Sequence, residues 1–266
     1  MSDWLNLSGK SVVVTGGSSG IGKAIVTSLL DLGVNVANFD VQASDIAHEN
    51  LFFVETDITD VANVKRSVQA VVDQFGKMDG LVNNAGINLP ALLVDAKEEN
   101  STYELTEESY NKMMDINLKG TFFVAQEVAR VFVHQQSGVM VNMSSESGIE
   151  GSEGQSIYAA TKAAMNSLTR SWSKELAKHN VRVIGVAPGI MEATGLRTIG
   201  YETALAYTRD KTVEELRAGY NNVSAIPLGR SGKLSEVADL VCYYLSERSS
   251  YITGVTTNVA GGKTRG

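Results

Sequence analysis

The feature that most constrains the fold of this chain is an alternation of short apolar runs with longer segments of helical periodicity. The apolar runs are rich in Val and Ile, and they lie at 11–15, 34–39, 51–55, 79–83, 138–143, 181–187 and 255–259. The helical segments lie at 20–32, 60–75, 107–134, 156–179 and 234–246. Apolar runs without polar alternation are typical of strands buried on both faces. The alternation therefore predicts an α/β fold, a doubly wound, mostly parallel, seven-stranded sheet (Rossmann-type) with helices on both faces.

Seven strands are one too few for an eight-stranded α/β barrel, which remains the alternative fold. The sequence has no internal repeat, low-complexity tract or linker, so we expect one domain over residues 1–266. Two segments break the alternation. Residues 97–108 hold five acids and one Lys, which favours a solvated loop entering a helix. Residues 195–233 are too long for an ordinary connection and predict a helical lid over a substrate.

Charge and composition exclude several classes of protein. The 23 basic and 30 acidic residues give a net charge of −7, which disfavours a general nucleic-acid binder. The only cysteine, Cys242, excludes an internal disulfide, and it forms no metal-ligand cluster with the three histidines. No apolar run reaches the roughly 18 residues that span a bilayer. Because the first residues also lack the features of a signal peptide, we expect a cytoplasmic protein with no metal and no membrane partner.

A glycine-rich turn, TGGSSGIG at 15–22, joins the first strand to the first helix. Glycines let a backbone approach a ligand closely, and the N-terminus of the helix attracts phosphate. The spacing is not that of the usual dinucleotide fingerprint, so tight helix packing is the alternative. Asp40 ends the second strand, where a carboxylate accepts both ribose hydroxyls, and the turn contains no Arg or Lys. Both features favour NAD over NADP, unless Asp40 only opens a surface loop.

A candidate acid–base pair lies on a later helix. Tyr158 and Lys162 are four residues apart and share one helix face. A neighbouring ammonium favours the phenolate, so we expect Lys162 to lower the pKa of Tyr158. A second Tyr-x-x-x-Lys pair, at Tyr207 and Lys211, makes this spacing weak evidence by itself. Ser145 distinguishes the first pair, because it ends a strand where ligands bind in a doubly wound sheet.

Several motifs together resemble those of the short-chain dehydrogenase/reductase family, and the match covers essentially the whole chain. They are TGGSSGIG, NNAG at 83–86, Asn117 in NLKG, Ser145, YAATK at 158–162 and the PG pair at 188–189. The resemblance implies that Tyr158 is the general acid/base and that Lys162 holds the nicotinamide ribose. It also implies that Ser145 orients the substrate oxygen, while Asn117 holds a water in a proton relay.

The same resemblance implies a set of NAD-binding positions. These are Gly16, Ser18, Ser19, Gly20, Ile21, Gly22, Asp40, Asp57, Ile58, Asn83, Ala85, Gly86, Tyr158, Lys162, Pro188, Gly189 and Met191. The alternative for Asn83 and Asn84 is a purely structural turn. One departure concerns the residue after the PG pair that often contacts the carboxamide: Ala193 occupies that position and Thr194 follows it.

The charge of the expected lid points to an anionic substrate. Residues 195–233 contain six cations and four acids, although the rest of the chain is acidic. The cations are Arg197, Arg209, Lys211, Arg217, Arg230 and Lys233. Such a lid favours a phosphate ester held by charge-assisted bonds, and ordinary ion pairs along an amphipathic helix are the alternative. Lys263 and Arg265 in the tail add two further cations.

The segments 144–164, 189–220 and 257–266 resemble bacterial sorbitol-6-phosphate 2-dehydrogenases. That resemblance implies NAD-dependent oxidation of C2 of D-sorbitol 6-phosphate to give D-fructose 6-phosphate. We expect Ser145, Glu146 and Tyr158 to contact the sugar, and Arg197 and Arg209 to hold the phosphate, with Glu150 a solvated loop acid. The alternatives are another polyol, ketose phosphate or secondary alcohol as substrate, or a non-catalytic NAD-binding regulator.

The family resemblance also implies a homotetramer that assembles through the helices at 107–134 and 156–179. Val124, Val128 and Val131 are candidates for that contact, because apolar residues on several faces of a helix can serve both its own sheet and a partner. The alternative is that these valines belong to the core of the chain.

Overall fold

One parallel sheet organises the computed structural model, which describes residues 4–195 and 197–263. Its strands are β1 (Ser11–Thr15), β2 (Asn35–Asp40), β3 (Leu51–Glu55), β4 (Gly80–Asn83), β5 (Gly138–Met143), β6 (Val181–Pro188) and β7 (Thr256–Val259). They are ordered β3-β2-β1-β4-β5-β6-β7, and each neighbouring pair runs parallel. This open sheet confirms the predicted doubly wound fold, and its two edge strands exclude the barrel.

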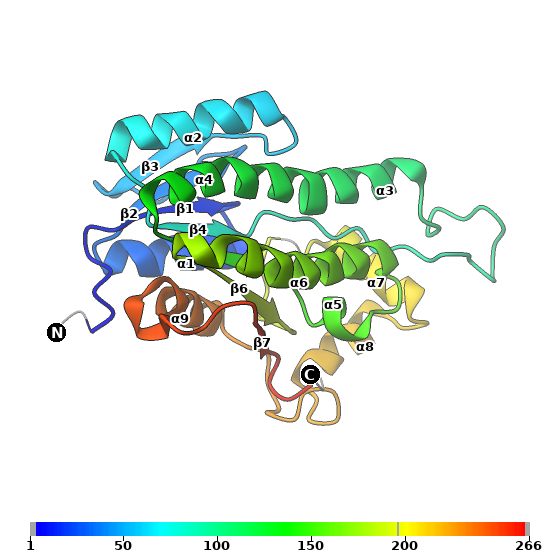
Figure 1. Cartoon of the computed structure of the whole chain (residues 1–266). Coiled ribbons are helices and arrows are strands. Elements are labelled where there is room, and N and C mark those ends of the chain that lie inside the picture. Colours follow the sequence, from blue (N-terminus) through cyan, green and yellow to red (C-terminus); the bar gives the residue numbers. More distant parts are fainter. Residues whose placement is uncertain (1–3, 196, 264–266) are drawn as a thin grey trace.

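Helices cover both faces of the sheet, as Figure 1 shows. The helices outside the lid are α1 (Gly20–Asp31), α2 (Val61–Phe75), α3 (Glu107–Met114), α4 (Thr121–Gln135), α5 (Ser147–Glu150), α6 (Ser156–Leu176) and α9 (Leu234–Leu245). Three single turns accompany them: η1 (Asp115–Gly120), η2 (Ala177–His179) and η4 (Glu247–Ser249). Helices α2, α4 and α6 pack on one face, while α1 and α9 pack together on the other.

The two apolar layers explain why the strands lack polar alternation. Successive side chains of a strand point to opposite faces of its sheet. In β1, Val12 and Val14 enter the layer beneath α1 and α9, whereas Val13 enters the layer beneath α2 and α4. Both layers exclude water, so most positions of the central strands are apolar, and the buried asparagines among them have hydrogen-bond partners.

The predicted helix at 107–134 is one continuous run with a local change of geometry. Between α3 and α4 lies η1, which is π-helical. Such bulges are rare and are frequent at functional sites, and this one carries Asn117. Val124 and Val128 in α4 are fully buried in the layer beneath α2 and α4, and Val131 packs against it. Val124 and Val128 are therefore core residues, as the alternative interpretation expected, whereas Val131 is partly exposed.

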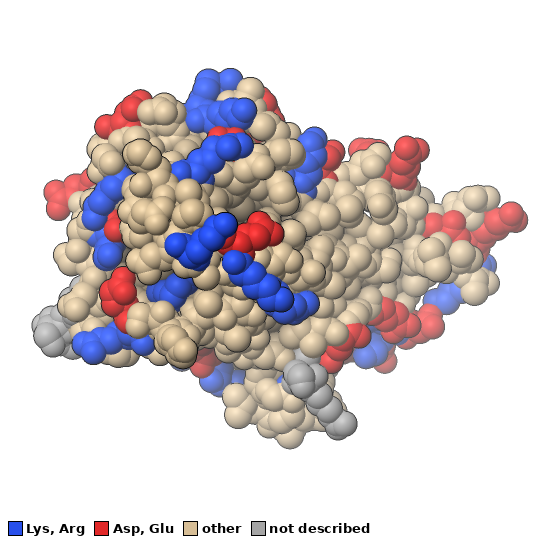
Figure 2. Space-filling view, in the orientation of Figure 1, with Lys and Arg blue, Asp and Glu red and all other residues tan. Residues whose placement is uncertain are grey.

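The acidic segment at 97–108 is only partly the solvated loop that we expected. Residues 97–100 are exposed and α3 then starts at Glu107, with Thr106 as its cap. However, the Tyr103 ring stacks on the Tyr207 ring of the lid, with their centroids 3.7 Å apart. In Figure 2 the projecting part of the molecule on the right carries mainly acidic side chains, whereas Lys and Arg lie mainly over the sheet and its helices.

The segment at 195–233 contains α7 (Ile199–Thr208), α8 (Val213–Ala218) and the turn η3 (Gly219–Asn221). Leu205, Ala206 and Leu216 give it a small apolar cluster of its own. Of the two tail cations, Lys263 is described and Arg265 lies outside the described residues. Within the described part of the chain, no helix is long and apolar enough to cross a membrane, and no three His, Cys, Asp or Glu side chains could hold a metal ion.

Candidate active site

A cleft of about 370 Å³ opens at the carboxyl ends of the strands, around the point between β1 and β4 where the strand order reverses. Most of the predicted cofactor positions line it. They are Gly16, Ser19, Gly20, Ile21, Asp40, Asp57, Ile58, Ala85, Gly86, Tyr158, Lys162 and Pro188. The cleft also includes Thr194, the residue shifted by one position from the expected carboxamide contact. The structure thus gathers these residues from five strand ends and two helices into one site.

The glycine turn forms a backbone cradle at the floor of the cleft. Gly16 and Gly20 have φ values of +65° and +54°, a conformation that residues with a Cβ rarely adopt. A Cβ on Gly22 would overlap the Gly16 carbonyl and lie 2.5 Å from Asn84 Nδ2. The first amides of α1 donate no hydrogen bond to the side chain of Ser19. Uncapped amides at a helix start and a floor without side chains fit the pyrophosphate of a dinucleotide.

The carboxylate of Asp40 is fixed at the rim of the cleft. Its Oδ2 accepts a hydrogen bond from the backbone N–H of Ser18 at 3.0 Å, and its Oδ1 accepts one from the N–H of Gln42 at 3.2 Å. Ser18 in turn donates through Oγ to the Gln42 carbonyl at 2.5 Å. Ser18 therefore holds the Asp40 carboxylate through its backbone N–H and does not line the cleft.

Four other predicted cofactor positions also lie outside the cleft lining. Gly22 packs beneath the turn, and Asn83 is buried with its Nδ2 donating to Asn142 Oδ1 at 2.9 Å. Gly189 packs against Ala260, and Met191 is buried beside the lid. The neighbouring Asn84 ties two strand ends together, because its Nδ2 donates to the carbonyls of Thr15 and Gly16. The structural alternative that we considered for the two asparagines thus describes their contacts.

Tyr158 and Lys162 lie in the first turns of α6 and face the cleft together, with Lys162 Nζ 5.7 Å from the centroid of the tyrosine ring. Lys162 Nζ donates to the Met143 carbonyl at 2.9 Å, and its side chain is buried. Burial disfavours the ammonium and lowers the pKa of Lys162 from 10.5 to about 8.

The pKa of Tyr158 differs from the sequence-based expectation. Burial raises the pKa of the phenol, while its hydrogen bond with Ser145 acts in the opposite direction and the nearby Glu146 carboxylate adds to the increase. The pKa of Tyr158 is therefore raised and not lowered in this structure, because burial outweighs the hydrogen bond with Ser145. Ser145 and Tyr158 meet at the end of β5, so the structure brings these two predicted residues together.

Asn117 binds the loop that follows β4. Its Oδ1 accepts from the backbone N–H of Ile87 at 2.8 Å, and its Nδ2 donates to the carbonyl of the same residue at 2.8 Å. A Cβ on Gly86 would lie 3.2 Å from Asn117 Oδ1 and 3.5 Å from Lys162 Nζ. The π-helical turn therefore places the asparagine amide and the lysine ammonium on the same side of Gly86.

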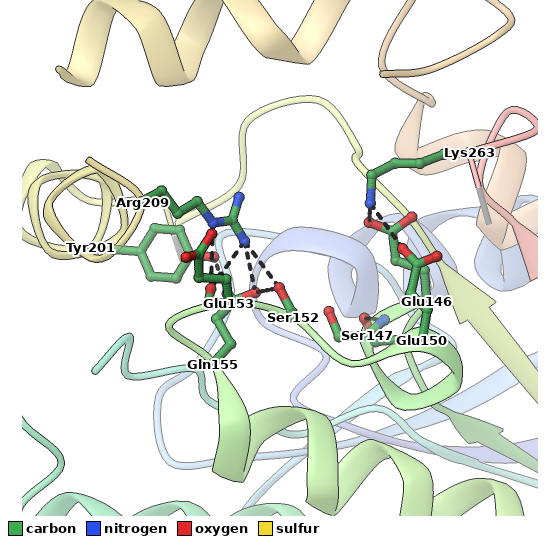
Figure 3. A network of polar contacts seen from close by, with 10 residues as sticks. Glu146, Ser147, Glu150, Ser152, Glu153, Gln155, Tyr201, Arg209 and Lys263 are labelled. Carbon is green, nitrogen blue, oxygen red and sulfur yellow. Dashed lines mark hydrogen bonds and ion pairs between the residues drawn. The ribbon is translucent and has the colours of Figure 1, made fainter. Parts of the chain in front are cut away.

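Glu146 and Glu150 both contact the tail. Lys263 Nζ lies 2.6 Å from a carboxylate oxygen of Glu146 and 3.3 Å from one of Glu150 (Figure 3). Glu146 is buried next to Ser145, whereas Glu150 is more exposed. Glu150 is thus exposed, as expected, and is also paired with Lys263 of the tail.

Some cations of the lid are already neutralised. Arg217 pairs with Glu202 at 2.6 Å, and Arg230 pairs with Glu236 at 2.6 Å. These two arginines therefore form the ordinary ion pairs that were the alternative to phosphate binding.

The two arginines that we expected to hold a phosphate have neutral contacts among the described residues. Arg197 donates to the Met191 carbonyl, and its guanidinium lies 4.1 Å from the centroid of the Tyr220 ring. Arg209 donates to Ser152 Oγ at 3.0 Å and to the Glu153 carbonyl at 3.4 Å (Figure 3). Because neither contact carries a negative charge, both guanidinium groups keep their positive charge at the lid.

Comparison with known proteins agrees with this geometry. The model of the short chain dehydrogenase family matches residues 10–204. The chain is 60% identical to a sorbitol-6-phosphate 2-dehydrogenase of Klebsiella pneumoniae, over the full length of both proteins. It is 37% identical to a 3-oxoacyl-[acyl-carrier-protein] reductase of Thermotoga maritima, over 97% of this chain and 99% of the relative. A 3-ketoacyl-(acyl-carrier-protein) reductase from Brucella melitensis, solved with NADH, superposes with a TM-score of 0.81 at 26% identity, over 98% of this chain and all of the other.

Proposed function

This chain belongs to the short-chain dehydrogenase family, and from that premise we propose that it oxidises D-sorbitol 6-phosphate at C2 to D-fructose 6-phosphate with NAD. The observation that carries this proposal is the 60% identity, without truncation on either side, to a sorbitol-6-phosphate 2-dehydrogenase. The two lid arginines with neutral contacts support it independently, because a phosphate dianion would supply the missing charge.

The geometry of Asp40 supports NAD as the cofactor. Its carboxylate lies on the cleft rim, held by two backbone N–H groups, where it would accept the ribose hydroxyls of adenosine and repel a 2′-phosphate. Replacing it by alanine should lower kcat/KM for NAD by about 10- to 100-fold, the effect of losing charged hydrogen bonds, while use of NADP improves. An unchanged ratio of the two activities would remove Asp40 from the argument.

The residues of the cleft can carry out the proton part of the reaction. NAD, when bound, would accept the hydride that leaves C2. Tyr158 would take the hydroxyl proton onto its phenolate oxygen as the C–H bond breaks, and would return it in the reverse direction. Ser145 would hold the same substrate oxygen, since it already contacts Tyr158. Lys162 and Asn117 would hold the ribose and relay the proton toward solvent.

Activity with phosphorylated and unphosphorylated sorbitol tests the substrate. We expect the purified protein to prefer D-sorbitol 6-phosphate, and Arg197→Met or Arg209→Met to reduce that preference by about 10-fold or more. Arg230→Met is the matched control, because Glu236 already neutralises this lid arginine. Equal kcat/KM for the two polyols in the unchanged protein would refute the phosphate ester as substrate. NADH binding without turnover of either would instead favour the regulator.

Two further properties belong to this proposal. We propose a homotetramer, which light scattering after size exclusion would test by mass, and a cytoplasmic location. We also propose that residues 1–266 act as one catalytic domain, with the segment 195–233 as its substrate lid. The contacts of Arg209 with Ser152 and Glu153 support a lid that closes on the loop leading into α6.

A further inference from the structure

Three polar side chains from separate segments converge above Tyr158, beyond the cofactor cleft. Asn88 follows β4, Gln155 precedes α6, and Tyr201 lies in the first turn of α7. Gln155 Nε2 donates to Tyr201 Oη at 2.9 Å, and Asn88 Nδ2 donates to the same oxygen at 3.4 Å. Figure 3 shows the ring of Tyr201 reaching from the lid toward Gln155. The phenol of Tyr201 is therefore one of the points at which the segment 195–233 contacts the body of the protein.

The hydrogen bonds at this phenol leave one donor and one acceptor unused. Tyr201 Oη accepts both bonds, and in the described structure its own hydrogen has no acceptor. Burial raises the pKa of Tyr201 to about 12, so this hydrogen is retained at working pH. Asn88 Oδ1 is buried and has no hydrogen-bond partner among the described residues. Buried polar atoms without partners are rare in folded proteins and are expected where a ligand completes the bonding.

An alcohol is the chemical group that satisfies both atoms at once. A hydroxyl accepts one hydrogen bond and donates another, so it can take the hydrogen of Tyr201 and give its own to Asn88 Oδ1. A carbonyl or a phosphate could satisfy only the donor, and an ammonium only the acceptor. The pair of open positions thus selects for a polyol chain over a ketone with a bare alkyl chain.

The location indicates which hydroxyl is concerned. Tyr201 is electrostatically coupled both to Tyr158, where the C2 oxygen would bind, and to Arg209, the expected phosphate ligand. Arg209 Nη2 also lies 3.5 Å from Oε1 of Gln155, which carries the same network toward the lid. A substrate held at Tyr158 and Arg209 would therefore place its middle carbons beside Tyr201, because Gln155 contacts both Tyr201 and Arg209 and lies three residues before Tyr158.

We propose that Asn88, Gln155 and Tyr201 form a recognition site for the hydroxyl on C3 or C4 of the polyol, with Tyr201 and Asn88 binding it and Gln155 fixing the phenol. This inference rests on the proposed function and deepens it, because it assigns the selection of a sugar chain to two binding residues and one residue that positions them. The lid would close fully only on a substrate that carries this hydroxyl.

Kinetics with Tyr201→Phe test the proposal, since this variant keeps the ring and removes only the hydroxyl. We expect kcat/KM for D-sorbitol 6-phosphate to fall about 10-fold, and to fall by the same factor for sorbitol without the phosphate. The Kd for NADH should not change. Tyr207→Phe is the matched control: it lies on the same helix, and its hydroxyl donates to Asp95 of the neighbouring loop at 2.7 Å. A general loosening of the lid would lower kcat/KM in both variants alike and would overturn the proposal.

Deoxy substrates make the test specific to one hydroxyl. With one of two analogues of D-sorbitol 6-phosphate, the 3-deoxy or the 4-deoxy compound, Tyr201→Phe should not lower kcat/KM any further. That analogue already lacks the hydroxyl to which Tyr201 would bind. Against the 1-deoxy analogue, the 10-fold loss should persist. A loss that is equal for all three analogues would refute the inference while leaving the proposed function intact. Absence of activity in the unchanged protein with sorbitol 6-phosphate would instead refute the proposed function.

Discussion

Lys162 provides the sharpest link between the geometry of the site and a measurable free energy. Its side chain is buried, and burial lowers its pKa from 10.5 to about 8. One pKa unit corresponds to about 1.4 kcal/mol, so holding the ammonium in the folded protein costs about 3 kcal/mol at neutral pH. The penalty is complete below pH 8, where both states bind the proton. It disappears as the pH rises toward 10.5, because the unfolded state then loses its proton as well.

We therefore predict that Lys162→Met inactivates the protein and stabilises it. Methionine fills a similar volume without charge, although the Met143 carbonyl loses the hydrogen bond that Lys162 donates at 2.9 Å. That loss offsets about 1 kcal/mol, which leaves a net gain of about 2 kcal/mol at pH 7. The gain should shrink steadily above pH 8 and reverse near pH 10. The free energy of unfolding from urea titrations at pH 7, 8, 9 and 10 measures this directly.

The matched control is Lys65→Met, which replaces an exposed lysine on α2. Its effect on unfolding should be small and should not change with pH in this range. If Lys162→Met destabilises the protein at pH 7, or if its effect is the same at pH 7 and pH 10, the lysine is not held at an electrostatic cost and the reasoning fails. Loss of activity without this pH dependence would assign Lys162 to binding alone.

Three other substitutions test the glycine turn, the sheet and the tail. Gly22→Ala should abolish NADH binding and lower the melting temperature, because its Cβ would lie 2.5 Å from a neighbouring side-chain nitrogen; near-normal binding in calorimetry would contradict the cradle. Arg182→Met should lower the free energy of unfolding by about 3 kcal/mol or more, because the guanidinium donates to three backbone carbonyls and a hydroxyl; a decrease below 1 kcal/mol would refute this. Lys263→Met should shift the pH profile for alcohol oxidation upward, because Glu146 then raises the pKa of Tyr158 without compensation; an unmoved profile would separate the tail from the chemistry.

The positions of strands and helices could be predicted because burial repeats along the chain with a regular period. The seven predicted runs are all strands, and the central ones are apolar because they lie between two helical layers. The glycine turn and Asp40 could also be predicted, because backbone conformation and charge are local properties. The π-helical turn around Asn117 could not be predicted from periodicity, because it interrupts a helix whose apolar positions continue on either side.

The hydroxyl site escaped prediction for a different reason. Asn88, Gln155 and Tyr201 are separated by 67 and 46 residues in the sequence, and none belongs to a repeated pattern. Polar residues in loops are common, and only their convergence distinguishes these three from solvated side chains. The strongest signal available beforehand was indirect: Gln155 lies three residues before the tyrosine of the YAATK motif, on the turn that must face a substrate.

The charges of the lid show why a sum along the sequence is a weak guide to a binding site. The net excess of two positive charges over 195–233 suggested an anionic substrate, yet the sum treats all six cations as equal. In the structure, Arg217 and Arg230 are neutralised by carboxylates at 2.6 Å, whereas Arg197 and Arg209 are held by carbonyls, a hydroxyl and an aromatic ring. Neutral contacts orient a guanidinium while leaving its charge available to a ligand. The arginines that the structure orients without neutralising them are therefore those that can bind the phosphate.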